Sequence, residues 1–230
     1  MCGGDSVSVD SIVVFEDVFV KYETSTGGVM ALRGVSFTVP KGGSLLFMGP
    51  SGSGKTTILE TILGIVRPMH GEVRVFGLKP EDEKSIMRVR RRTGYLTQDG
   101  MMINELTIME NVLFYCQGRE RTVSKDKILE LARKLNIESI LNKRPDQVSG
   151  GEVRRAELLM VLADEPELLL LDEPTSMLDP ENSDRVLKVL SEFKDSTTMI
   201  ITSHDPRLTS ISENILNIYG GQLTGSSKGA

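Results

Sequence analysis

Residues 45–57 form an apolar run followed by a glycine-rich loop that ends in a lysine and two threonines: Leu45-Leu46-Phe47-Met48-Gly49-Pro50-Ser51-Gly52-Ser53-Gly54-Lys55-Thr56-Thr57. Leu45–Met48 predicts a strand, and Thr56–Ile65 predicts a helix. In Gly-x-x-x-x-Gly-Lys-Thr, backbone N–H groups surround phosphates at the positive end of the following helix dipole. Glycine is needed because a Cβ would block the close approach or the required backbone angles. The strand–loop–helix order therefore predicts a nucleotide site.

The residues that close this loop carry distinct chemistry. The Lys55 ammonium is expected to reach the β- and γ-phosphates, the Thr56 hydroxyl to bind Mg²⁺, and Thr57 to contact the α-phosphate. The predicted nucleotide-binding residues of this stretch are Gly49, Pro50, Ser51, Gly52, Ser53, Gly54, Lys55, Thr56 and Thr57. This pattern predicts a bound nucleotide without indicating which class of nucleotide hydrolase the chain is.

Two acidic residues follow an apolar run of leucines. Asp172 and Glu173 come directly after Leu168–Leu171, which predicts a strand buried on both faces of a mainly parallel sheet. Such a strand places carboxylates at the carboxyl edge of the sheet, where the phosphate loop also lies. We predict that Asp172 holds Mg²⁺ through water and that Glu173 orients and polarises the attacking water. Phosphoryl transfer needs mainly positioning and charge compensation, so one well-placed acid suffices.

A second candidate anion site lies a hundred residues further on. Val148-Ser149-Gly150-Gly151-Glu152 precedes a helix predicted over Glu152–Leu162. A serine hydroxyl and the free N–H groups at a helix start together bind anions. Because the chain already has one phosphate loop, a second anion site has no obvious use within the same chain.

Composition indicates one soluble domain, or one domain with an insertion. The 230 residues are 39% hydrophobic and 26% charged, which is ordinary for a globular protein. The net charge of -5 argues against a general nucleic-acid binder. No run approaches the roughly 18 apolar residues that cross a bilayer, and Met1–Asp5 lacks the features of a secretory signal. We expect a cytoplasmic chain whose membrane role requires a partner.

Metal binding by cysteine or histidine is not expected. Cys2 and Cys116 are the only cysteines, and no Cys-x-x-Cys or Cys/His cluster occurs. His70 and His204 do not have the spacing of zinc ligands relative to them. The sequence predicts two free thiols and no structural zinc.

The apolar pattern divides the chain into strand-rich and helical parts. The region between Met101 and Arg144 is predicted to be helical, because Ile128, Leu129, Leu131 and Leu135 follow the helical period. Residues 225–230 and Met1–Asp10 are predicted to be loose ends. Strands are predicted at Ile12–Val20, Val35–Val39, Leu45–Met48, Glu72–Phe76, Thr93–Leu96, Leu168–Leu171, Thr198–Thr202 and Ile215–Tyr219.

Taken together, the phosphate loop, the Ser-Gly-Gly helix start and the Asp-Glu strand end resemble the ATP-binding subunit of an ABC transporter, from about Ile12 to Leu223. The resemblance implies an α/β fold: a P-loop NTPase core with a mainly parallel sheet, an N-terminal antiparallel β subdomain and a helical insertion. We expect a single ABC ATPase domain over residues 1–230, with a helical subdomain at about 101–163. ATP and Mg²⁺ are the expected cofactors.

The same resemblance assigns four further positions. Gln98 resembles the Q-loop residue that contacts Mg²⁺ or the water and reports to the transmembrane partner. Asp179 resembles the D-loop residue that joins the sites of two subunits. His204 resembles the switch histidine that hydrogen-bonds the γ-phosphate, and Tyr22 lies where the family places a ring against adenine. The expected catalytic residues are thus Glu173, His204 and Gln98, and the Mg²⁺ ligands are Thr56, Gln98 and Asp172.

In the family, the Ser-Gly-Gly segment is the signature that caps the γ-phosphate held by the other subunit of a head-to-tail pair. The resemblance therefore implies an ATP-sandwiched homodimer or pseudo-dimer. Val148 stands where leucine is usual, and Glu152 stands where glutamine is commonest. The stretch Ala156–Leu162 lacks the run of small residues and arginine that is common on this helix.

The resemblance also suggests a branch and its partners. Lys143–Gln147 replaces the Thr-x-Val-Gly-Glu segment of fused transporters, as in stand-alone subunits. Ala31–Phe37 and His204–Arg207 look most like the lipoprotein-release and macrolide-efflux branch, and importers remain an alternative. Integral membrane permease chains are then the expected partners, nucleic acid is not, and the chain would lie on the inner face of the cell membrane.

The competing class is a soluble ABC ATPase. Iron–sulfur assembly ATPases are single cassettes of similar length, so architecture leaves them open. Translation members usually carry two cassettes, and DNA-repair members carry coiled-coil or zinc inserts, neither of which occurs here. The basic run Arg88–Arg92 is predicted to be a solvated helix end, because no aromatic residues are interleaved with it for base stacking.

Overall fold

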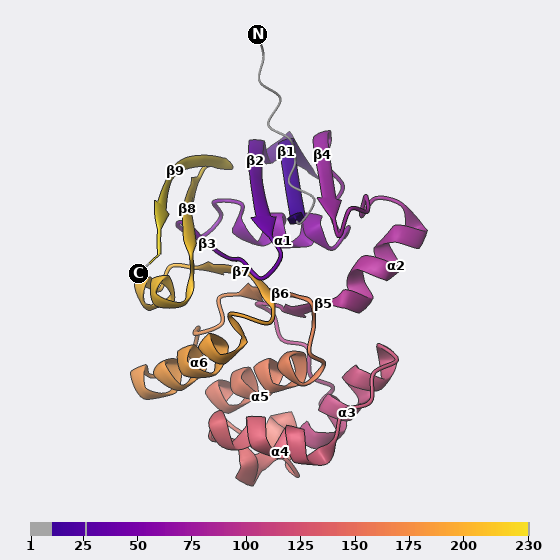
Figure 1. Cartoon of the computed structure of the whole chain (residues 1–230), viewed down its shortest axis with the longest axis vertical. Helices are drawn as coiled ribbons and strands as arrows, with labels where there is room; N and C mark the ends of the chain where they lie inside the picture. Colours follow the sequence, from indigo (N-terminus) through magenta and orange to yellow (C-terminus); the bar gives the residue numbers. More distant parts are fainter. Residues whose placement is uncertain (1–10, 26, 230) are drawn as a thin grey trace.

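The predicted strands assemble into two sheets in the computed structural model, which describes residues 11–25 and 27–229 (Figure 1). An antiparallel sheet has the order β2-β1-β4 and a second, six-stranded sheet has the order β5-β6-β7-β3-β8-β9. All neighbouring pairs of the second sheet are parallel except β8 and β9. The bounds are β1 Ser11–Thr24, β2 Gly27–Pro40, β3 Ser44–Met48, β4 His70–Val75, β5 Thr93–Leu96, β6 Leu168–Asp172, β7 Thr198–Ser203, β8 Asn214–Tyr219 and β9 Gln222–Lys228.

Strand β6 is apolar throughout because both of its faces are covered. Leu168 and Leu170 belong to the hydrophobic cluster formed with the antiparallel sheet and α1 (Lys55–Ile62). Leu169 and Leu171 belong to the second cluster, which is formed with α3, α4, α5 and α6. All four leucines are fully buried. This two-sided burial is the reason for a continuous apolar run, and it brings the end of β6 out at the carboxyl edge of the sheet.

Helices α3, α4, α5 and α6 gather at the end of the molecule away from the antiparallel sheet (Figure 1). Helix α5 packs on α3 and α4 there, and α6 covers the same side of the sheet through Val186, Val189 and Leu190. Helix α2 precedes β5. The bounds are α2 Glu83–Arg92, α3 Ile108–Gly118, α4 Lys125–Lys134, α5 Gly150–Ala163 and α6 Pro180–Phe193, with 3-10 turns at Glu138–Ile140, Pro145–Gln147 and Pro206–Ile211.

The structure confirms the α/β class and corrects details of the prediction. Helix α1 ends at Ile62 rather than Ile65, since Gly64 adopts a left-handed φ of 62° and a Cβ there would lie 2.1 Å from the Pro80 carbonyl oxygen. The predicted loose tail is wrong over most of its length, because β9 pairs antiparallel with β8 up to Lys228. Met1–Asp10 lies outside the described residues.

Within residues 11–25 and 27–229, no helix is both long and apolar enough to span a bilayer. The longest helices, α5 and α6, have 14 residues each.

Candidate active site

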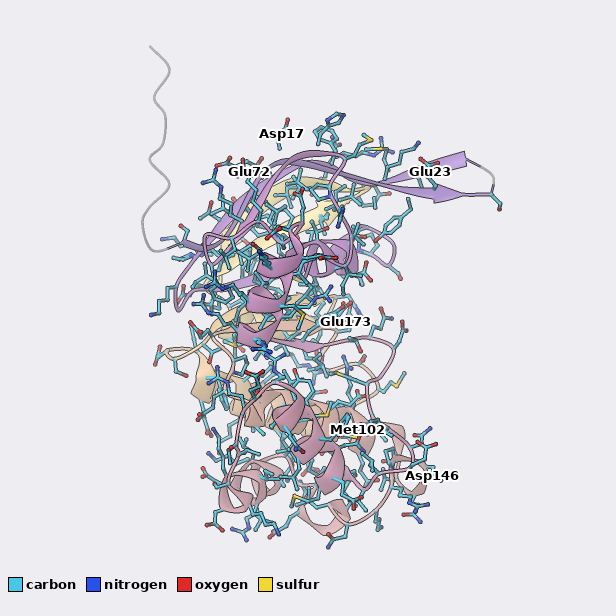
Figure 2. All side chains as sticks on the ribbon, turned by 90° about the vertical axis from the view of Figure 1, so that its right-hand side faces the viewer. Asp17, Glu23, Glu72, Met102, Asp146 and Glu173 are labelled. Carbon is cyan, nitrogen blue, oxygen red and sulfur yellow. The ribbon has the colours of Figure 1, made fainter. Side chains whose placement is uncertain are left out.

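A cavity of about 520 Å³ opens at the carboxyl edge of the parallel strands. Figure 2 shows Glu173 at mid-height, between the antiparallel sheet that carries Asp17 and Glu72 and the helical end near Met102 and Asp146. The predicted residues that line the cavity are Tyr22, Ser51, Gly52, Gly54, Lys55, Thr56, Thr57, Gln98, Asp172, Glu173 and His204. Segments far apart in the sequence therefore share one hollow.

The loop before α1 leaves the helix start open to this cavity. Among the α-helices of the described chain, α1 alone begins without a side-chain cap, since its N-cap residue is Gly54 with a φ of 108°. A Cβ at Gly54 would lie 2.6 Å from the Ala31 carbonyl oxygen. Lys55 folds back and donates to the carbonyl oxygens of Gly49 (2.7 Å) and Pro50 (3.1 Å). N–H groups and a buried ammonium at one helix start form an anion site.

Thr56 and Asp172 join the loop to the end of β6. The Thr56 hydroxyl donates to Asp172 Oδ2 at 2.7 Å, and Thr202 on β7 donates to Asp172 Oδ1. Asp172 is 1% exposed, so both carboxylate oxygens are held by hydroxyl groups. The structure thus brings together two of the three residues that the sequence assigns to Mg²⁺, and the third, Gln98, lines the same cavity.

Glu173 is held as a rigid carboxylate beside Lys55. Its φ of 49° is left-handed, and its N–H donates to the Thr202 carbonyl at 2.9 Å. Ser203 donates to Glu173 Oε2 at 2.9 Å, and His204 Nδ1 lies 3.2 Å from Oε1. Lys55 Nζ lies 3.8 Å from Oε1. A carboxylate oriented by a serine and a histidine at the edge of an anion site can polarise a water molecule.

Tyr22, on β1, also lines the cavity. Its hydroxyl donates to Glu60 Oε2 at 2.9 Å and lies 3.4 Å from Thr57 Oγ1. Burial, with further contributions from Glu60, raises the pKa of Tyr22. The residue is 37% exposed and lines the cavity.

The Ser-Gly-Gly segment and Asp179 lie outside the cavity lining. Ser149 caps α5 in a capping box: Glu152 N donates to Ser149 Oγ at 3.3 Å, while Ser149 N donates to Glu152 Oε2 at 2.8 Å. Asp179 caps α6 by accepting from Asn182 N at 2.8 Å. Val148 is partly buried against the core. The second helix start therefore takes no part in lining the cavity that contains the phosphate loop of the same chain.

Several residues of the site were not predicted. Thr202 and Ser203 orient the two acids, and Glu60 anchors Tyr22. Arg154 on α5 donates to the carbonyl oxygens of both Asp172 and Glu173. The sequence holds one signal for it: Arg154 and Glu157 carry opposite charges three positions apart on a predicted helix, and this spacing favours an ion pair. The cavity is also lined by Val29, Met30, Ala31, Arg33, Ser176, Gly220 and Gly221.

Comparisons with known proteins agree with this geometry. The family model described as ABC transporter matches residues 32–176. The ABC transporter ATP-binding protein YxdL of Bacillus subtilis (strain 168) is 35% identical over 200 residues, which cover 84% of this chain and 78% of YxdL. The cell division ATP-binding protein FtsE of the same organism is 33% identical over 192 residues, covering 81% and 84% of the two chains.

Among solved structures, the dimeric post-hydrolysis state of the ATP-binding cassette MJ0796, bound to ADP and Pi, superimposes with a TM-score of 0.87 at 28% identity. The match covers 94% of this chain and 98% of that one.

Proposed function

The chain belongs to the ABC transporter family, as an ATP-binding and ATP-hydrolysing subunit, and we propose how its residues energise transport through separate transmembrane chains. The observation that carries the proposal is the arrangement around Glu173. Its carboxylate is oriented by Ser203 and His204. Glu173 Oε1 lies 3.8 Å from Lys55 Nζ, at the uncapped N-terminus of α1. This arrangement supports the proposal that Glu173 acts beside the γ-phosphate.

In this proposal the loop N–H groups and Lys55 hold the phosphates, and Tyr22 lies against the adenine. Glu173 orients and polarises the attacking water, and His204 donates a hydrogen bond to the γ-phosphate. Gln98, which also lines the cavity, contacts the water or the metal. The protein needs only to position these groups, because the transition state of phosphoryl transfer is stabilised mainly by charge and alignment.

The oxygen donors of Thr56, Asp172 and Gln98 suit Mg²⁺, a hard cation that usually takes one or two protein ligands together with phosphates and water. No cluster of three or more His, Cys, Asp or Glu side chains in the described chain could hold a metal by itself. Mg²⁺ binding would therefore depend on the nucleotide. When bound, the ion would neutralise charge on the phosphates.

We further propose that two copies meet head to tail, with Ser149–Gly151 of each copy capping the γ-phosphate of the other and Asp179 joining the two sites. The position of Ser149 outside its own cavity supports this arrangement. The remaining proposals are a single ABC domain with a helical part at about 101–163, and permease partners at the inner face of the cell membrane. The lipoprotein-release and macrolide-efflux branch is the proposed branch, resting on Ala31–Phe37 and His204–Arg207.

The test is the Glu173→Gln variant. It keeps the side-chain shape but removes the charge that polarises water, so Mg²⁺-dependent ATP hydrolysis should fall by about a hundredfold or more, while ATP affinity stays within about twofold of the wild-type value. Calorimetric titration with ATP and a phosphate-release assay measure the two quantities. Equal turnover in variant and wild type would remove Glu173 as the base.

The transport role is tested separately, by capturing the tagged Glu173→Gln chain with ATP and Mg²⁺ from detergent-solubilised membranes. A polytopic membrane protein recovered in near-equal ratio supports the transporter function. Recovery of soluble iron–sulfur scaffold proteins alone would replace it with the soluble ATPase class.

A further inference from the structure

Arg154 and Glu157 form a buried ion pair inside α5. Arg154 Nη1 lies 3.2 Å from Glu157 Oε2, and the two side chains are only 5% and 3% exposed. A buried pair is weak evidence for stability, because desolvation of the charges offsets most of their attraction. The contacts that the two side chains make outside the pair therefore indicate what it does.

Those contacts reach both catalytic segments. Arg154 Nη1 donates to the Thr97 carbonyl at the end of β5, and Nη2 donates to the carbonyls of Asp172 and Glu173, the latter at 3.1 Å. Glu157 Oε1 accepts from Met101 N at 2.8 Å. The pair thus clamps residues 97–101, the segment that carries Gln98, at both ends.

The Glu173 backbone needs such support. A left-handed φ of 49° is costly for a residue with a Cβ and persists only where surrounding contacts hold it. Its N–H is held by the Thr202 carbonyl, and its carbonyl accepts from Ser176 N and from Arg154 Nη2, each at 3.1 Å. Loss of the Arg154 contact would leave this carbonyl with the Ser176 hydrogen bond alone. The peptide plane that follows Glu173 would then be held less firmly, and the carboxylate could shift from the position set by Ser203.

We propose that Arg154, paired with Glu157, is a positioning residue for ATP hydrolysis. It holds the Glu173 turn and the Gln98 segment in one arrangement and ties both to the helix that begins at Ser149. A guanidinium suits this role because its planar fork offers donors in two directions, whereas a lysine ammonium is a point charge. The inference rests on the proposed role of Glu173 as the base.

The test compares this buried pair with a second ion pair in which the acid is buried and the arginine is partly buried. Arg154→Gln with Glu157→Gln removes both charges together, so no unpaired charge is left buried. We expect kcat to fall about tenfold or more with KM for ATP within about twofold, because the nucleotide contacts of the loop do not change. The matched control is Arg119→Gln with Asp164→Asn. That pair, 2.6 Å apart, also touches β5, but at Thr93 and away from the catalytic turn.

The control should lose comparable thermal stability and keep its kcat. If both double variants lose kcat in proportion to their melting temperature, Arg154 is merely structural and the inference fails. Arg154→Lys keeps the charge, and we expect its kcat to remain about as low as that of the double variant. A wild-type kcat in Arg154→Lys would overturn the need for the fork.

A coupling measurement separates this inference from the proposed function. In the Glu173→Gln background, the Arg154/Glu157 double change should lower the single-turnover rate by a smaller factor than it does in the wild type, because the part of its effect that acts through the Glu173 carboxylate is already lost. Fully additive losses would overturn the inference. Undiminished hydrolysis by Glu173→Gln alone would instead contradict the proposed base. If Glu173→Gln is inactive while the Arg154/Glu157 double variant is fully active, the proposed role of Arg154 is wrong and that of Glu173 stands.

Discussion

At the scale of single residues, Tyr22 performs two separable tasks. Its ring lines the cavity, while its hydroxyl is anchored to Glu60. We predict that Tyr22→Ala weakens ATP binding about tenfold, because stacking of a base on an aromatic ring is worth about 1–3 kcal/mol. Tripolyphosphate binding should be nearly unchanged, and Tyr22→Phe, which keeps the ring, should resemble the wild type. Calorimetric titration with both ligands provides the measurement. Equal losses for ATP and tripolyphosphate would show that Tyr22 does not stack.

The site residues that could be predicted are those inside contiguous motifs. Lys55, Asp172 and Glu173 each stand next to a strand whose apolar pattern fixes where it ends, and the structure brings them together. Arg154 could not be placed in the same way, since its acceptors at Thr97 and Glu173 lie 57 and 19 positions away. Local periodicity carries no information about such contacts; they depend on how α5 packs against the sheet.

At the scale of elements, two helices share one capping motif, but only one of the two is proposed to take part in the nucleotide site. Helices α3 and α5 begin with the same capping box, Thr107 with Glu110 and Ser149 with Glu152. The pKa of Glu110 is lowered from its ordinary value, mainly by the hydrogen bond from the Thr107 N–H and next by that from the Thr107 hydroxyl. The Ser149 N–H and hydroxyl lower the pKa of Glu152 in the same way. Each carboxylate therefore favours folding at pH values above its ordinary pKa. That contribution is lost as the pH falls through the lower, folded-state pKa.

We predict that Glu110→Gln and Glu152→Gln each lower the free energy of unfolding at about pH 7, because a carboxylate suits the positive end of a helix. The difference from the wild type should shrink as the pH falls through the lowered folded-state pKa values, and it should vanish once the carboxylates are protonated in both the folded and the unfolded chain. Urea denaturation over a series of acidic pH values measures it. Only Glu152→Gln should also alter ATP turnover, since of α3 and α5 only α5 is proposed to face a phosphate. A change of turnover in both variants would contradict that assignment.

Strand β9 shows where element prediction fails. Its side chains are exposed or half-exposed along the whole of Gln222–Lys228, so hydropathy gives no signal. Backbone pairing with β8 is sufficient to order it, from Tyr219–Gln222 to Asn214–Lys228. By contrast, β6 and β7 are buried on both faces, and their apolar runs predicted them within one residue.

At the scale of the whole molecule, the phosphate loop and the start of α5 do not line the same cavity, and we propose that they belong to sites shared between two copies. The phosphate loop lines the cavity, and the start of α5 does not. If two copies combine head to tail, each complete site takes its loop from one copy and Gly150 from the other. A self-contained site would need both from the same copy. Symmetry thus makes the two arrangements distinguishable by mixing variants.

The mixing experiment combines Lys55→Ala with Gly150→Asp. The second change adds a negative charge where the partner's phosphate is proposed to lie. It should not disturb folding, because the nearest atom to a Cβ at Gly150 is Met177 Sδ at 4.0 Å and an acidic residue suits the first helical turn. Each variant alone should be inactive. A mixture of equal parts should recover about a quarter of the wild-type ATPase rate, because half of the pairs are mixed and each mixed pair has one complete site.

The recovered rate should rise with total protein concentration, as association of the two variants requires, and a phosphate-release assay over a dilution series measures it. Mixing Lys55→Ala with Lys55→Ala, Glu152→Gln is the matched control, since every loop in that mixture is defective and no complete site can form. Activity absent at all concentrations of the productive mixture would mean that phosphate loop and signature do not act across copies of this chain, and the head-to-tail homodimer would have to be abandoned.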